Sequence, residues 1–424
     1  MALYIYLLIL ISSALLFKRK FKRLINFAFI FNAIWCVFGA ISTLGLFDMR
    51  IPVMEIHIYA WTFIGIVDII ILLFAKKASA PQMLRESEFA RQKYSFKYVA
   101  VFQIVSLLLI SVLFFNSMFS LIENGNFSAI RNEFYGILYD SFYLDFLFRS
   151  LPVAMMNGLI VFYVFTAFIS GEMQRLIYAA INCFIVTVCN GGRYTLILLL
   201  FAIVVCFITL NWKNKLRARQ IIAYSKIIIW LTIFVVLSLV VITFIRNQDL
   251  SNNIVFYYSG SLSFLDRILE NKELFGFDEG LMYGYMTFGA FCEPVVLFIK
   301  AVFNTDIDVP SYHFNIYCQE FYNISTGEPL RINNNTSVLY YFLRDFGAIG
   351  IVIGAVFLGT LLVISYNNMR KNKLFSGLFF VYFANVMFNT LMTYQFFGNA
   401  PIVIVFTLFM CSRQGESRGK TEFR

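Results

Sequence analysis

The sequence is poor in charged residues and in histidine. Only 14% of its 424 residues are charged and only two are histidine, whereas 60% are hydrophobic. A soluble domain is closer to half apolar and a quarter charged, because it must present a polar surface to water. The composition therefore excludes a water-soluble globular protein and predicts an integral membrane protein.

The motifs that mark soluble enzymes are also missing. The sequence has no P-loop, no G-x-G-x-x-G after a strand, no G-x-S-x-G and no H-E-x-x-H. Two histidines are too few for a histidine-rich metal site, and the seven cysteines form no C-x-x-C or zinc spacing. We therefore expect no cofactor and no metal. Most cysteines should pack in apolar runs, although Cys292 and Cys318 share a mixed segment and could pair in an oxidising compartment.

What the sequence does contain is a series of long apolar runs. Runs of roughly 17 to 25 residues suit helices that cross about 30 Å of hydrocarbon. We predict an all-α polytopic membrane protein, a single domain over residues 1–424 with about eleven transmembrane helices. The predicted spans are 2–17, 24–47, 56–75, 98–119, 150–170, 176–189, 194–210, 227–245, 346–366, 374–394 and 396–411.

A further apolar run covers residues 281–303 and is long enough to cross. It carries Glu293-Pro294 at its centre, which places a charge in lipid and removes a backbone donor. If it crossed, the basic residues that follow it would face the wrong side. We predict a re-entrant or surface-lying helix instead.

The basic residues set the orientation. The net charge of +10 comes from short basic segments between apolar runs, which is typical of cytoplasmic loops and gives no reason to expect a nucleic-acid partner. This pattern places the N-terminus outside and the C-terminus in the cytoplasm. Two segments then face outward: an interfacial loop rich in aromatic residues at 120–149, and a large extracytoplasmic loop at 246–345 that contains helices. Asp68 lies within a span, as a functional carboxylate or as a partner of a neighbouring helix.

Arginines on the outer side are candidates for binding phosphate, because the guanidinium fork matches phosphate oxygens. Arg193 follows Gly191-Gly192, which indicates a special turn, and Arg246, Arg331 and Arg344 belong to the long loop. Each could instead extend to lipid headgroups, and Arg344-Asp345 could be only an ion pair.

The long loop also offers candidates for a proton acceptor and for sugar contacts. His313, Glu293 and Asp345, together with Glu320, could accept a proton from an attacking hydroxyl, or could have structural roles. Its tyrosines could stack on sugar rings or anchor the chain at the interface. The tyrosines that we single out are Tyr258, Tyr312 and Tyr340.

Taken together, these features resemble the O-antigen and capsule repeat-unit polymerases, the Wzy family of bacterial polysaccharide polymerases. The resemblance is carried by Gly191-Gly192-Arg193, by one long late outer loop, and by 333–340 leading into Asp345-Phe346-Gly347. It implies a GT-C-like, metal-independent membrane glycosyltransferase in the bacterial cytoplasmic membrane. The growing glycan on undecaprenyl diphosphate would be the donor and a lipid-linked repeat unit the acceptor.

In that family's setting, a chain-length regulator and a flippase would be partners, beside membrane lipids. The resemblance assigns Arg193, Arg246, Arg331 and Arg344 to the diphosphate, and His313, Asp345 or Glu293 to the catalytic base. Two alternatives stay open. A transporter or flippase for lipid-linked glycans would need charges within the bundle, and a ligase would transfer one finished glycan to another acceptor.

Overall fold

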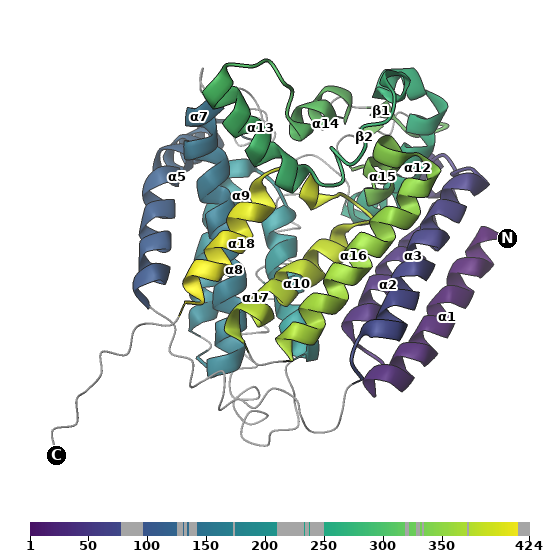
Figure 1. Ribbon diagram of the computed structural model, residues 1–424, viewed down its shortest axis with the longest axis horizontal. Coiled ribbons are helices and arrows are strands. Elements are labelled where there is room, and N and C mark those ends of the chain that lie inside the picture. Colours follow the sequence, from purple (N-terminus) through teal and green to yellow (C-terminus); the bar gives the residue numbers. More distant parts are fainter. Residues whose placement is uncertain are drawn as a thin grey trace. The chain divides into compact units, whose positions relative to one another are not determined.

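The computed structural model describes most of the chain. The described residues are 1–77, 96–124, 130, 134, 142–172, 174–209, 233, 237, 250–318, 322–327, 331–332, 335–370 and 373–413. These residues are mainly helical, and Figure 1 shows the helices in sequence colours. The predicted span 227–245 lies almost wholly outside them, as do half of the loop 120–149 and the residues Arg246 and Glu320.

The chain divides into two compact units. The first comprises Met1–Ser79, Asn247–Asn367 and Phe383–Ile402, and the second comprises Ala80–Arg246, Asn368–Tyr382 and Val403–Arg424. Three helices, α16 (Ala348–Met369), α17 (Leu374–Asn389) and α18 (Ala400–Cys411), contribute residues to both units.

The first unit contains long apolar helices and a series of shorter elements. Its long helices are α1 (Ala2–Phe21), α2 (Phe27–Ser42), α3 (Met54–Phe74), α12 (Leu250–Glu270) and α16 (Ala348–Met369). Its shorter elements are η1 (Leu46–Asp48), η3 (Lys272–Phe275), η4 (Phe277–Glu279), α13 (Gly289–Phe303), α14 (Pro310–Cys318), β1 (Tyr322–Asn323), β2 (Arg331–Ile332), α15 (Val338–Phe346) and η5 (Gln395–Phe397). The two strands pair antiparallel, with Tyr322 opposite Ile332.

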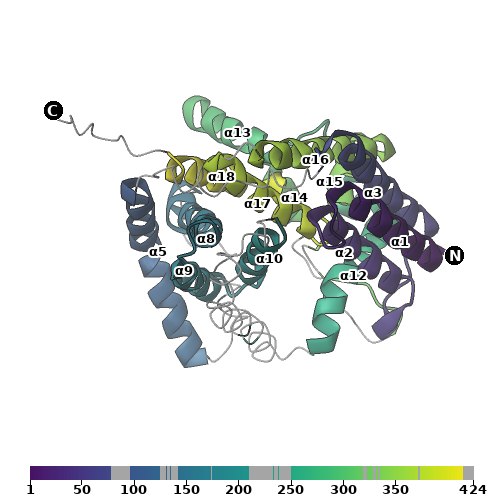
Figure 2. The same ribbon diagram turned by 90° about the horizontal axis from the view of Figure 1, so that it is seen from below.

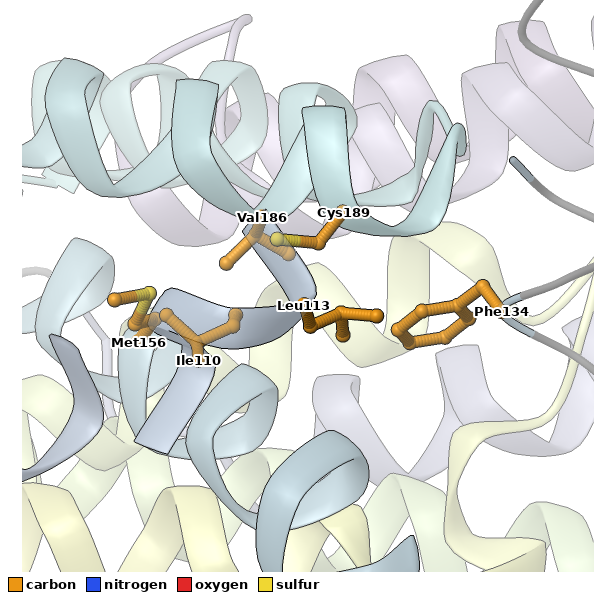
Figure 3. Packing of buried hydrophobic residues seen from close by; sticks show 6 residues of the cluster. All are labelled: Ile110, Leu113, Phe134, Met156, Val186 and Cys189. Carbon is orange, nitrogen blue, oxygen red and sulfur yellow. The ribbon is translucent and has the colours of Figure 1, made fainter. Parts of the chain in front are cut away.

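The second unit is a helical bundle. Its elements are α5 (Phe96–Asn124), α7 (Phe142–Asp145), the π-helix η2 (Phe146–Ser150), α8 (Leu151–Ser170), α9 (Arg175–Asn190) and α10 (Tyr194–Thr209), with parts of α17 and α18. Figure 2 shows α8, α9 and α10 nearly end-on, with α8 and α9 side by side. The core between α5, α8 and α9 includes Ile110, Leu113, Met156, Val186 and Cys189, with Phe134 packed beside them (Figure 3).

Polar side chains also join helices within this bundle. Gln103 and Asn182 exchange two amide hydrogen bonds of 2.9 and 3.0 Å, and the Tyr163 hydroxyl donates to the same glutamine. Such bonds satisfy amides that lipid cannot solvate. The bundle is therefore held by polar contacts as well as by packing.

The helices agree with most of the predicted spans. Within the described residues, five helices are long and apolar enough to cross a membrane: α1, α3, α5, the continuous helix Phe146–Ser170, and α16. Five shorter apolar helices, α2, α9, α10, α17 and α18, coincide with further predicted spans. A helical membrane protein is thus confirmed, while the total of eleven spans stays a prediction.

At one end of the first unit, the loop between α2 and α3 contacts both the N-terminus and the long segment. Met1 and Thr43 line a common pocket of about 310 Å³, and Arg50, in the loop between α2 and α3, forms an ion pair of 2.7 Å with Asp266 of α12. Thr326, next to the short hairpin, donates its N–H to the carbonyl of Asp48. In Figure 1 the elements α13, α14, α15 and the hairpin lie at this same end of α2, α3 and α16.

The opposite end of the first unit carries its basic clusters. Lys20 donates to the carbonyl of Leu72 at 2.6 Å, and Asn367, at the end of α16, bonds to the backbone of Phe74 and Lys76. These contacts join the basic ends of α1, α3 and α16. The basic residues of these helices thus gather at one end of the unit, as the predicted orientation in the membrane requires.

Helix α13 is followed by a return of the chain toward the point where the helix begins. Its 15 residues extend roughly 22 Å at 1.5 Å per residue. The chain on either side of α13 meets again, because the Tyr285 hydroxyl donates to the carbonyl of Asp308. This agrees with the prediction of a re-entrant or surface-lying helix over 281–303.

The structure decides between the alternatives left open for Asp68 and for the cysteines of the long segment. The amide of Asn32 on α2 donates to both oxygens of Asp68 on α3, each at 2.9 Å. This is the structural alternative considered for Asp68, a carboxylate bonded to a neighbouring helix. The cysteines Cys292 and Cys318 are both free thiols, so they do not form the disulfide considered from their spacing.

Candidate functional site: the end of helix α15

The short helix α15 organises the candidate site in the first unit. The helix ends at Phe346 because Gly347 adopts a left-handed φ of 61° and donates its N–H to the carbonyl of Leu343. The carbonyls of Arg344 and Asp345 then accept N–H groups from Met282 and Tyr283. The loop between α12 and α13 is therefore folded around the last turn of α15.

Asp345 holds this loop from inside. Its side chain is 0% exposed, and its two oxygens accept the backbone N–H groups of Met286, at 3.0 Å, and Thr287. Burial raises the pKa of Asp345, while these hydrogen bonds oppose the shift. A base must reach the hydroxyl that it deprotonates. The arrangement favours a structural role for Asp345 over the predicted one.

Glu293 on α13 has a similar environment. It is buried, and it accepts the N–H of Ser311 at 3.3 Å and a backbone hydrogen bond from Asn399. Burial raises its pKa, again against these hydrogen bonds. Glu293 thereby joins α13 to the start of α14 and to the turn before α18, which is also a structural role.

Arg344 is the most buried cation of the site. Its side chain is 2% exposed, and it donates to the carboxylate of Glu279 at 2.9 Å and to the carbonyl of Gly280. The guanidinium carbon lies 5.6 Å from the centre of the Phe277 ring. Arg344 does form an ion pair, but with Glu279 and not with the adjacent Asp345. Both terminal nitrogens of its guanidinium already donate to the protein, so a bidentate contact with a diphosphate would compete with these bonds.

His313 is differently placed from the two buried carboxylates. It is half-buried on α14, with its ring edge-on to Tyr285 at 6.1 Å and to Tyr312 at 6.4 Å. No hydrogen bond within the described part of the chain engages its ring nitrogens. Of the three predicted bases, His313 therefore has the side chain that is most open to a substrate.

The three predicted sugar-stacking tyrosines lie in different environments. Tyr312 is 48% exposed and can present its ring, whereas Tyr258 stacks on Phe38 with 4.7 Å between ring centres. Tyr340 is 0% exposed and packs against the rings of Phe277 and Phe314. A sugar cannot stack on a ring enclosed in this way. The role predicted for Tyr340 is not available in this structure.

Arg193 belongs to the second unit. It is half-buried and caps the start of α10, where its carbonyl accepts the N–H of Ile197. Gly191 before it has a left-handed φ of 55°, and the side chain of Asn190 accepts the N–H of Gly192 at 2.7 Å. The special turn predicted from Asn-Gly-Gly-Arg is confirmed. The convergence of Arg193 with the arginines of the long loop stays a prediction.

The side chains of the other two predicted arginines, Arg246 and Arg331, are not described by the structure. Arg246 lies outside the described residues, and of Arg331 only the backbone in strand β2 is described. Within the described residues, no three His, Cys, Asp or Glu side chains are grouped to hold a metal ion. The described part of the site therefore comprises Arg344, His313 and the carboxylates around α15.

Sequence reasoning missed Glu279, although a signal was present. Gly276, Gly280 and Gly284 surround the acidic pair Asp278-Glu279 at intervals of four residues, and all three glycines adopt positive φ. Such backbone positions favour glycine because they crowd a side chain. A glycine-rich turn around two acids could have indicated a shaped loop.

Comparisons with models of known protein families, with curated proteins and with solved structures give no match to this chain. The functional proposal therefore depends on the residues themselves, together with the resemblance stated above.

Proposed function

We propose that this protein is a membrane glycosyltransferase that polymerises lipid-linked oligosaccharide repeat units into a surface polysaccharide. The growing glycan would move from undecaprenyl diphosphate to a hydroxyl of a new lipid-linked repeat unit. The protein would lie in the bacterial cytoplasmic membrane, with its N-terminus and the 246–345 segment outside and its C-terminus in the cytoplasm. We retain the eleven spans and the GT-C-like architecture as parts of this proposal.

The observation that supports it best is the folding of the long outer segment. Residues 250–318 and 335–345 form helices and turns that are joined to the loop between α2 and α3 through Arg50 and Asp266, and to one another through the loop around Asp345. An enzyme acting on lipid-linked glycans needs such a scaffold beside the membrane, because catalysis depends on holding reacting groups in position. A simple connecting loop would not be built in this way.

The rival transport function has less support. A transporter for charged lipids would be expected to place ionisable groups along a path within its helices. Asp68 is the ionisable group that the sequence places within a span, and both of its oxygens are already bonded to Asn32. The polymerase is therefore the stronger proposal, and a ligase remains its nearest relative in chemistry.

The reaction requires two protein functions. The bond between the donor sugar and the diphosphate breaks, the acceptor oxygen bonds to that sugar carbon, and a base takes the hydroxyl proton. We assign the proton to His313, because its ring is more open than Asp345 or Glu293. Arg193 would stabilise the negative charge that develops on the leaving diphosphate, with Arg246 and Arg331 as further predicted contacts.

A reconstituted assay tests the proposal. The purified protein in lipid vesicles is supplied with lipid-linked repeat units from the cells that make it, and the products are separated by size. We expect a ladder of glycans that differ by one repeat unit. One transferred chain would indicate a ligase, and movement of the substrate across the vesicle without growth would indicate a flippase. Either result would overturn the polymerase.

The same assay tests Arg193. Arg193→Ala should slow polymerisation by about ten- to a hundredfold, because a charge-assisted contact contributes roughly 1.5 to 3 kcal/mol. Arg193→Lys should restore only part of the rate, since a lysine lacks the planar fork. Normal chain growth by the alanine variant would remove Arg193 from the proposed diphosphate site.

A further inference from the structure

Glu279 is held in place by two side chains that are distant in sequence. Arg344 donates to one carboxylate oxygen at 2.9 Å, and the hydroxyl of Tyr317 on α14 donates to the other. The hydrogen bond to Glu279 raises the pKa of Tyr317 to about 12, with burial adding to the shift. The carboxylate is thus fixed from two sides by a buried cation and a phenol.

The backbone beneath this carboxylate is shaped to present it. A side chain at Gly276 would meet the Tyr317 ring at 2.7 Å and the Arg344 guanidinium at 3.0 Å, and φ there is 72°. Gly280, directly after Glu279, has a φ of 90°. Only glycine adopts such conformations readily. The turn therefore lets Glu279 approach Arg344 closely.

Glu279 nevertheless stays accessible. Its side chain is 47% exposed, whereas the arginine that holds it is 2% exposed. A carboxylate has about four lone-pair positions, and Arg344 and Tyr317 occupy two of them. The remaining positions can accept hydrogen bonds from a ligand without any loss to the fold.

The neighbours of Glu279 also suit a sugar. Tyr317 and His313 are four residues apart on α14 and so share one face of that helix. Tyr285 packs edge-on against the His313 ring, and the exposed Tyr312 lies beside it. A fixed carboxylate and a histidine thus lie along one face of α14, with the exposed ring of Tyr312 next to that histidine.

We propose that Glu279 accepts hydrogen bonds from hydroxyl groups of the acceptor sugar, and that Arg344 and Tyr317 are positioning residues that hold its carboxylate. This inference rests on the proposed polymerase function and gives it an acceptor-binding residue. It places the acceptor sugar along α14, with its attacking hydroxyl toward His313.

The charge of this surface narrows the class of sugar. Arg344 offsets the charge of Glu279, while the neighbouring Asp278 is exposed and close enough to Tyr317 to affect its pKa. The net charge of Glu279, Arg344 and Asp278 together is therefore negative, and a negatively charged ligand would be repelled. We infer that an uncharged or amino sugar is bound here, not a uronic acid.

The test is the dependence of chain growth on acceptor concentration. Glu279→Gln keeps an oxygen for Arg344 but loses the charge that strengthens bonds from sugar hydroxyls. We expect the KM for the lipid-linked acceptor to rise about tenfold or more, with little change in the KM for the donor. Glu273→Gln, which alters an exposed glutamate in η3, is the matched control and should behave as the unaltered protein.

The outcomes separate this inference from the function on which it rests. If the unaltered protein makes no glycan ladder, the polymerase proposal fails. If it makes one and Glu279→Gln saturates with acceptor as the unaltered protein does, only the acceptor site fails. An equal loss for donor and acceptor would indicate a structural role and would also overturn it.

A second variant keeps the test decisive if Glu279→Gln does not fold. Tyr317→Phe preserves the ring and removes the hydroxyl that donates to Glu279. A freer carboxylate should raise the acceptor KM by about threefold, which corresponds to one hydrogen bond of modest strength. If this variant folds and its acceptor KM is unchanged, Tyr317 does not position the carboxylate of Glu279, and the inference is wrong.

Discussion

The carboxylates around α15 fall into two groups that differ in exposure and in partners. Asp345 and Glu293 are buried and accept hydrogen bonds from backbone N–H groups. Glu279 is half exposed and is held by the side chains of Arg344 and Tyr317. Buried backbone groups must be paired if the fold is to be stable. The first group therefore serves the fold, and the second group, together with His313, is free to meet a substrate.

The strongest test of this comparison is at His313. We predict that His313→Gln lowers the polymerisation rate at saturating substrate by about a hundredfold or more, because general base catalysis contributes typically 10²- to 10⁴-fold. The thermal unfolding temperature should change little, since the ring is half-buried and makes no hydrogen bond within the described residues. Asn315→Ala, on the same helix, is the control. A variant that polymerises at the normal rate would remove His313 from the chemistry.

Much of the fold could be predicted from the sequence because it depends on local properties. The length and apolarity of segments such as Met54–Phe74 and Ala348–Met369 are sufficient to identify membrane helices. The Glu293-Pro294 pair predicted that 281–303 does not cross the membrane, and the contact between Tyr285 and Asp308 on either side of α13 agrees with that prediction. Gly191-Gly192 likewise predicted a turn, because left-handed backbone conformations select glycine.

The candidate site was predicted less well because it depends on contacts between distant residues. Arg344 and Glu279 are 65 residues apart, and no local pattern couples them. The sequence 338–346 could also be taken as the start of the following span, which hides the fact that Tyr340 and Asp345 are fully buried. Tertiary packing, not residue type, decides which tyrosine meets a sugar and which carboxylate meets a backbone N–H.

The comparison makes a second prediction at Asp345. Asp345→Ala leaves the N–H groups of Met286 and Thr287 without their acceptor, and each buried unpaired group costs about 1 to 3 kcal/mol. We expect the free energy of unfolding in detergent to fall by roughly 2 to 5 kcal/mol. Asp345→Asn, which keeps one acceptor oxygen, should lose less. A stable but inactive Asp345→Ala protein would mean that Asp345 serves the reaction and not the fold.

The smallest expected effect concerns Glu293 and its dependence on pH. Burial raises the pKa of Glu293, so the folded protein holds this proton at pH values where the unfolded chain has lost it. The resulting stability is fully present below the ordinary carboxyl pKa of about 4.3 and is lost as the pH rises through the raised value. Glu293→Gln stays uncharged at every pH. Its stability relative to the unaltered protein should therefore increase as the pH rises through that window, as measured by unfolding between pH 4 and 8. An identical pH profile for the two proteins would mean that the folded state does not raise the pKa of Glu293, and it would contradict the effect of burial on this carboxyl.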